Sequence, residues 1–87
     1  MYILNYQEYD ALDYYMTKSK LYDSGLYLKQ EPNKGDYFID SEENTEYSLD
    51  DGLRLIADTF TSSFYEDYPK EVCDSLYKLY KKRGLEI

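Results

Sequence analysis

Near the start of the chain, apolar residues recur at helical spacing. Three of them, separated by three and four positions, lie on one face of a helix: Tyr9, Leu12 and Met16. Asn5 and Glu8 are spaced as in a capping box, where the two side chains bind the free amides at a helix start. The pattern predicts a helix from about Tyr6 to Thr17.

Two short apolar runs with β-favouring residues follow, at 26–28 and 37–39. Between them, residues 33–35 read Asn-Lys-Gly, which is turn chemistry because glycine adopts positive φ at little cost. The segment therefore predicts a β-hairpin with its turn near residues 31–35. Residues 45–47, Thr-Glu-Tyr, are candidates for a short third strand.

The clearest amphipathic pattern comes next. Ser48 is a good N-cap, and Asp50 and Asp51 fall in the first turn, where the helix dipole favours carboxylates. Gly52 is expected to weaken that turn. One helical stripe runs through six apolar residues, which we expect to centre the core: Leu49, Leu53, Ile56, Ala57, Phe60 and Phe64.

A last helix is predicted after Tyr68, with Asp67 as its cap and Pro69 in its first turn. Its buried stripe is expected to contain Val72, Leu76, Leu79 and Tyr80. Four bases near its end complement the helix dipole, and Gly84 suits the stop: Lys78, Lys81, Lys82 and Arg83. The expected fold is one α+β domain over residues 1–87, with an N-terminal helix, a short antiparallel β-hairpin or three-stranded sheet, and two C-terminal helices.

Charge is segregated along the chain. Residues 36–67 hold ten acids and one base, Arg54, and so carry −9, while the rest of the chain carries +1. Such a field attracts a basic protein, speeds association and repels nucleic acid. The net charge of −8 therefore argues against direct contact with nucleic acid or an anionic membrane. We interpret the acidic third as a surface that binds a protein.

Composition narrows the chemistry further. There is no His, so a Ser-His-Asp site or a His-ligated metal is not possible, and Cys73 is the only cysteine. We expect Cys73 to be a packed residue, and no enzyme activity, cofactor or metal. The acidic run 40–51 has the length of an EF-hand loop, but Thr45 stands where that loop needs glycine.

The 13 tyrosines exceed what so small a core can bury, so several rings should lie at the surface, where tyrosine favours protein contacts. An AT-rich genome explains the tyrosine count equally well. No leader or membrane-spanning run is apparent in the sequence. We expect a protein of the bacterial host cytoplasm.

Three short stretches carry a resemblance to a known family: residues 35–39 (Gly-Asp-Tyr-Phe-Ile), the acid-rich residues 40–44, and Tyr65-Glu66-Asp67 before the last helix. Together with the order of elements, they make the chain similar to small phage anti-CRISPR proteins that inhibit type II-A RNA-guided nucleases by imitating the PAM-bearing DNA. In that family, acids at the hairpin turn and before the last helix occupy the PAM-reading site. The resemblance thus implies those roles for Asp36 and for Glu66 with Asp67.

Carboxylates suit such a site because PAM readers present arginine forks, which bind paired oxygens, and because clustered carboxylates can replace phosphates. The expected partner-binding residues are Asp36, Tyr37, Asp40, Glu42, Glu43, Glu46, Glu66 and Asp67. Two other functions fit the same composition. One is an immunity protein or antitoxin that neutralises a basic toxin, and the other is a small regulatory module that binds one basic protein.

Overall fold

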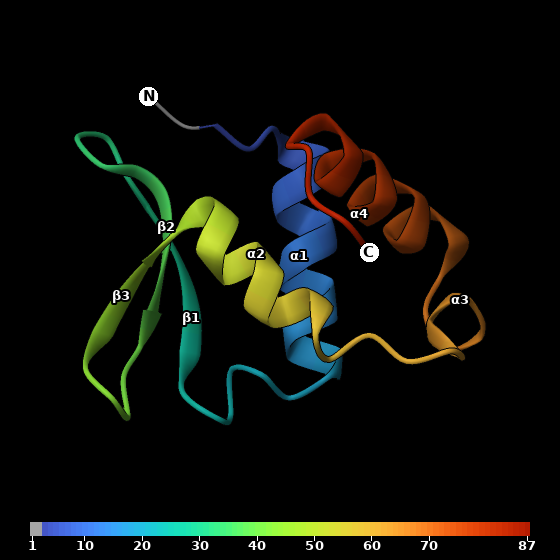
Figure 1. Cartoon of the computed structure of the whole chain (residues 1–87), viewed down its shortest axis with the longest axis horizontal. Helices are drawn as coiled ribbons and strands as arrows, with labels where there is room; N and C mark the ends of the chain where they lie inside the picture. Colours follow the sequence, from blue (N-terminus) through green and yellow to red (C-terminus); the bar gives the residue numbers. More distant parts are fainter. Residues whose placement is uncertain (1–2) are drawn as a thin grey trace.

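The computed structural model describes residues 3–87. Its elements confirm the α+β layout of an N-terminal helix, a three-stranded antiparallel sheet and C-terminal helices. Along the chain they are α1 (Tyr6–Lys18), β1 (Leu26–Glu31), β2 (Gly35–Asp40), β3 (Thr45–Ser48), α2 (Leu49–Ala57), α3 (Phe64–Asp67) and α4 (Lys70–Lys82) (Figure 1). No helix in the described range is long and apolar enough to cross a bilayer.

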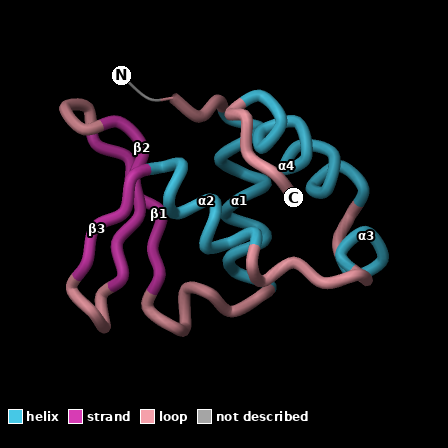
Figure 2. The backbone as a smooth tube through the Cα atoms, viewed as in Figure 1, coloured by secondary structure: helices cyan, strands magenta, loops and turns pink. Residues whose placement is uncertain are grey.

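The sheet has the order β1-β2-β3 and stands at one end of the molecule, with the helices beside it (Figure 2). Its register places Leu28, Phe38 and Tyr47 in one cross-strand row. Because side chains alternate between the two faces, this row marks the inward face, and α2 packs on it against β2 and β3. The helix α1 packs against α4, which completes the core on the other side.

Both predicted helix starts are present. The amide of Glu8 donates to Asn5 Oδ1 at 2.8 Å and the amide of Asn5 donates to Glu8 Oε1 at 2.9 Å, so the capping box is complete. Ser48 Oγ accepts from the amide of Asp51 at 3.2 Å. The strand β3 passes into α2 without an intervening loop, because Ser48 ends the strand and caps the helix.

The predicted helical stripe is shorter than expected. The helix α2 ends at Ala57, so Phe60 and Phe64 lie beyond it. Their rings nevertheless join the core as an aromatic cluster: the Phe60 centroid lies 5.0 Å from that of Tyr15 and 4.6 Å from that of Phe64. The one-turn helix α3 follows, and ring packing rather than helical phase keeps these two residues inside.

The start of the last helix also differs from the expectation. Pro69 occupies the N-cap position of α4, without a side-chain cap, and Asp67 is instead the last residue of α3. The predicted buried stripe is mostly correct, since Leu76, Leu79 and Tyr80 have no exposed surface. The C-terminal end of α4 is as expected, because Gly84 takes the left-handed conformation with φ of 71°.

Candidate protein-binding surface

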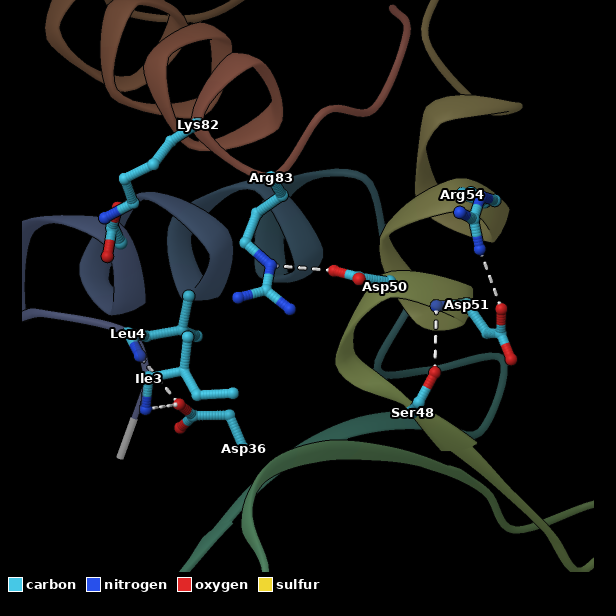
Figure 3. A network of polar contacts seen from close by, with 10 residues as sticks. Ile3, Leu4, Asp36, Ser48, Asp50, Asp51, Arg54, Lys82 and Arg83 are labelled. Atoms are coloured by element: carbon cyan, nitrogen blue, oxygen red, sulfur yellow. Dashed lines mark hydrogen bonds and ion pairs between the residues drawn. The ribbon is translucent and has the colours of Figure 1, made fainter. Parts of the chain in front are cut away.

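Asp36, the first acid expected to meet a partner, is only 4% exposed. Its Oδ2 accepts hydrogen bonds from the amides of Ile3 at 2.6 Å and Leu4 at 2.7 Å (Figure 3), and its Oδ1 accepts from Gln30 Nε2 at 2.6 Å. Asp36 is therefore engaged within the protein, which does not favour its predicted contact with a partner. Its side chain lies on the inward face of the hairpin, where it holds the segment before α1.

Tyr37 does not offer its ring to a partner either. It lies on the opposite face of β2 but is only 7% exposed. Its hydroxyl donates to Glu31 Oε1 at 2.6 Å, and Lys34 Nζ lies 4.9 Å from the ring centroid. Side chains of the same hairpin therefore cover most of Tyr37, and its contact with a partner stays a prediction.

The turn between β2 and β3 keeps its acids at the surface. Asp40 shapes this turn, because its Oδ1 accepts from the amides of Glu42 at 3.0 Å and Glu43 at 3.3 Å. Asn44 completes the turn with φ of 53°, a conformation that asparagine tolerates. Glu42 and Glu43 are exposed, and neither carboxylate forms an ion pair with any residue of the described range.

Glu46 on β3 is exposed but paired. Its Oε1 lies 2.9 Å from Lys34 Nζ, across the outer face of the sheet. Both side chains are about half exposed, so solvent screens the pair and it adds little stability. A partner that engages Glu46 has to compete with Lys34, so Glu46 is a weaker candidate than the acids of the turn.

Glu66 and Asp67 are exposed on α3, at the far end of the molecule from the sheet (Figure 1). Asp67 Oδ2 accepts from Ser63 Oγ at 2.8 Å, and the Asp67 carbonyl accepts from Lys18 Nζ. The structure thus separates Asp36 from this pair. The single site implied by the resemblance, with all three acids together, is not formed.

Some of the surface acids, though not all of them, lie on segments that share one side of the molecule. The β2–β3 turn, the loop after α1, the end of α2 and α3 all lie along the lower side of Figure 1. The turn contacts the loop after α1 through the amide of Ser41 and the carbonyl of Gly25, at 2.9 Å. We call this side the acidic edge and define it by Asp23, Asp40, Glu42, Glu43, Asp58, Glu66 and Asp67.

The acidic edge carries more acids than bases. Lys18, at the end of α1, donates to the Asp67 carbonyl, and Lys20 follows on the loop; neither forms an ion pair with a carboxylate within residues 3–87. With an overall molecular length of 35 Å, the edge runs from the sheet to α3 along the long axis of the molecule. It presents separated carboxylates in a row rather than a single cluster.

Carboxylates nearer the end of α4 are paired within the protein. Glu8 Oε2 lies 2.6 Å from Lys82 Nζ, and Asp50 Oδ1 lies 2.8 Å from Arg83 Nε (Figure 3). The hydrogen bond to Asp50 raises the pKa of the Arg83 guanidinium. These bases were expected only to complement the dipole of their own helix. They instead join α4 to α1 and α2, which sequence spacing alone does not reveal.

Cys73 is fully buried among core side chains, as expected for a packed residue. Burial, reinforced by the charge of Asp74, raises the pKa of its thiol, so the nucleophilic thiolate is disfavoured. Residues 3–87 contain no group of three acids or cysteines placed to hold a metal ion.

Comparison with protein-family models, with curated proteins and with solved structures finds no match for this chain.

Proposed function

We propose that this protein is a non-enzymatic inhibitor that binds a basic, nucleic-acid-binding enzyme and blocks its DNA site. The supporting observation is the acidic edge, whose acids form no ion pair within residues 3–87, whereas Glu8 and Asp50 are ion-paired to Lys82 and Arg83. Like charges left without counter-charges along one side of a molecule disfavour the compact state through self-repulsion. A binding role accounts for that cost, because a positively charged partner then supplies the missing counter-charges.

The edge suits mimicry of a nucleic-acid strand. Its carboxylates are spread along the long axis of a molecule 35 Å in length, as phosphates are spread along a strand. A channel that holds such a strand presents lysine and arginine side chains to it, and arginine forks bind carboxylates with two parallel hydrogen bonds. The first target to test is a type II-A RNA-guided nuclease, because of the sequence resemblance. Asp36 is excluded from the proposed contact because it is buried.

The test measures how a guide-loaded type II-A nuclease binds a fluorescent PAM-bearing duplex. We expect the wild-type protein to abolish this binding at low salt and to lose potency as salt rises. Reversal at both ends of the edge, with Glu42→Lys, Glu43→Lys, Glu66→Lys and Asp67→Lys, should weaken inhibition by about 100-fold or more. The charge-matched control reverses acids elsewhere, with Glu31→Lys, Glu71→Lys, Asp74→Lys and Glu86→Lys.

If the edge reversal and the control weaken inhibition equally, net charge rather than the edge is responsible. If the wild-type protein leaves the nuclease unaffected at every salt concentration, the proposed target is wrong. The alternative, in which the partner is a basic toxin, would then be tested by isothermal titration calorimetry with the protein that the neighbouring gene encodes. That binding should still depend on the edge acids.

A further inference from the structure

A second surface feature lies apart from the acidic edge. A hollow of about 350 Å³ opens where the start of α1 meets the end of β1, and both lie on the upper side of Figure 1. It is lined by Leu4, Asn5, Tyr6, Tyr9, Asp10 and Gln30. Two aromatic rings, an exposed carboxylate and a side-chain amide therefore surround one space.

Tyr6 is unusual among the aromatic residues. It is 87% exposed, and its ring and hydroxyl have no aromatic or hydrogen-bond partner within residues 3–87. A large ring left in water contributes nothing to the core, and the capping box formed by Asn5 and Glu8 does not use it. Such a ring is suited to close over a bound group.

The electrostatic environment of the hollow is negative. Burial raises the pKa of Tyr9, and the charges of Asp13, Asp10 and Asp36 raise it further, while no basic side chain acts on it in the opposite direction. Side-chain oxygens already bind four of the backbone amides at the start of α1. In the capping box, the amides of Asn5 and Glu8 each donate to the other residue's side chain. The amides of Ile3 and Leu4 donate to the carboxylate of Asp36.

We propose that this hollow binds the guanidinium group of an arginine side chain from a protein partner. A guanidinium stacks on tyrosine rings, is more weakly hydrated than an ammonium and binds a carboxylate through two nitrogen atoms. Tyr6 and Tyr9 supply the rings and Asp10 supplies the carboxylate. The side-chain amide nitrogen of Gln30 donates a hydrogen bond to Asp36. The carbonyl oxygen of the same side chain is left to accept a hydrogen bond from the ligand.

The experiment is a ¹⁵N–¹H NMR titration of the whole protein with N-acetyl-arginine-methylamide at low salt. The matched probe is N-acetyl-citrulline-methylamide, which has nearly the same shape but no charge. We expect saturable binding in the millimolar range, with shift changes centred on the amides of Tyr6, Tyr9, Asp10 and Gln30. The citrulline probe should bind at least about fivefold more weakly, as expected when a cation–π contact and a charged hydrogen bond are lost.

Variants distinguish this hollow from general attraction to an acidic protein. Tyr6→Ala and Asp10→Asn alter exposed side chains, so the fold should persist, and each should weaken arginine binding by about two- to fivefold. Tyr77→Ala and Glu86→Gln, an exposed tyrosine on α4 and an exposed acid after it, should leave it unchanged. The reversed acidic edge should also leave it unchanged, so this inference is tested independently of the proposed inhibitor.

Three results would overturn the assignment. Shift changes spread evenly over all exposed acids would show unspecific attraction. Equal binding of the citrulline probe would show that the hollow does not recognise charge. An equal loss in the Glu86→Gln control would place the contact elsewhere.

Discussion

The ring of Phe38 lies directly over the backbone of Gly52. A Cβ atom built on Gly52 would stand 2.1 Å from Cδ1 of Phe38 and 2.6 Å from its Cγ. Phe38 itself has no exposed surface. Gly52 therefore allows α2 to approach the middle strand of the sheet, which explains a glycine in the first half of a helix.

Replacing this glycine should destabilise the protein. Alanine has the higher helix propensity, worth about 0.8–1 kcal/mol, but the added methyl group overlaps a buried ring, and overpacking costs about 1–3 kcal/mol. We expect Gly52→Ala to lower the free energy of unfolding in urea by about 1–2 kcal/mol. The double variant Gly52→Ala with Phe38→Leu should lose less than the sum of the single variants. Additive losses would contradict the proposed contact.

The buried carboxylate of Asp36 should be a stability determinant. Its three hydrogen bonds tie the segment before α1 and Gln30 to β2. Asp36→Ala leaves those donors unsatisfied, and bonds to a charged group are worth about 1.5–3 kcal/mol each. We expect a loss of about 2–4 kcal/mol by urea unfolding, with amide exchange accelerated at residues 3–8. Glu43→Ala, at an exposed and unpaired acid, is the control and should change stability by less than about 0.5 kcal/mol.

Stability should fall at alkaline pH because of buried tyrosines. Burial raises the pKa of Tyr80 well above its ordinary value of 10.0, and its hydroxyl donates to the carbonyl of Leu53. The unfolded chain releases this proton near pH 10 whereas the folded protein keeps it. Stability is therefore fully present below about pH 10 and declines above it, by about 1.4 kcal/mol per pH unit for each such group.

The Tyr80→Phe variant isolates this contribution. At neutral pH it should lose about 1 kcal/mol with the hydrogen bond, and above pH 10 its stability should fall less steeply than that of the wild type. Urea midpoints measured at pH 7, 9, 10 and 11 provide the comparison. Parallel curves for the two proteins would rule out Tyr80 as a source of alkaline sensitivity.

Cys73 should be inert in the folded protein. Its thiol has a raised pKa, no exposed surface, and the carbonyls of Phe64 and Tyr68 within 3.6 and 3.7 Å of its sulfur. Labelling with Ellman's reagent at pH 8 requires opening of the core, so we expect it to be slower than in 8 M urea by about 100-fold or more. Rapid labelling of the native protein would mean that α3 opens readily from α4.

Local signals in the sequence predicted most of the fold. The capping box at Asn5, the turn before Gly35 and the N-cap at Ser48 each act within a few residues, so their chemistry can be recognised from spacing alone. The end of α2 was missed because Phe60 continues the helical phase beyond Ala57, although it packs through ring contacts instead. Tertiary packing decided that boundary.

The candidate surface was predicted less well. The acids of the β2–β3 turn and α3 are exposed as expected, but Asp36 is buried by partners 32 and 33 residues earlier in the chain. The internal pairing of Asp50 likewise depends on Arg83, a separation of 33 residues. Charge counts along a sequence cannot distinguish an acid held by a distant amide or base from one that faces solvent. One signal was present in the sequence. Asp36 lies two residues before Phe38 in the same strand, so the side chains of both residues point to the inward face.

The direct passage of β3 into α2 has a mechanical consequence. Because no loop intervenes at Ser48, β3 continues directly into α2, and the acidic turn between β2 and β3 lies at the other end of β3. A receptor that grips the turn meets a preformed shape, so little conformational entropy is lost on docking. Force on the turn is transmitted through β3 and α2 to the core. The protein should therefore keep its own conformation when a partner binds rather than adapt its shape to that partner.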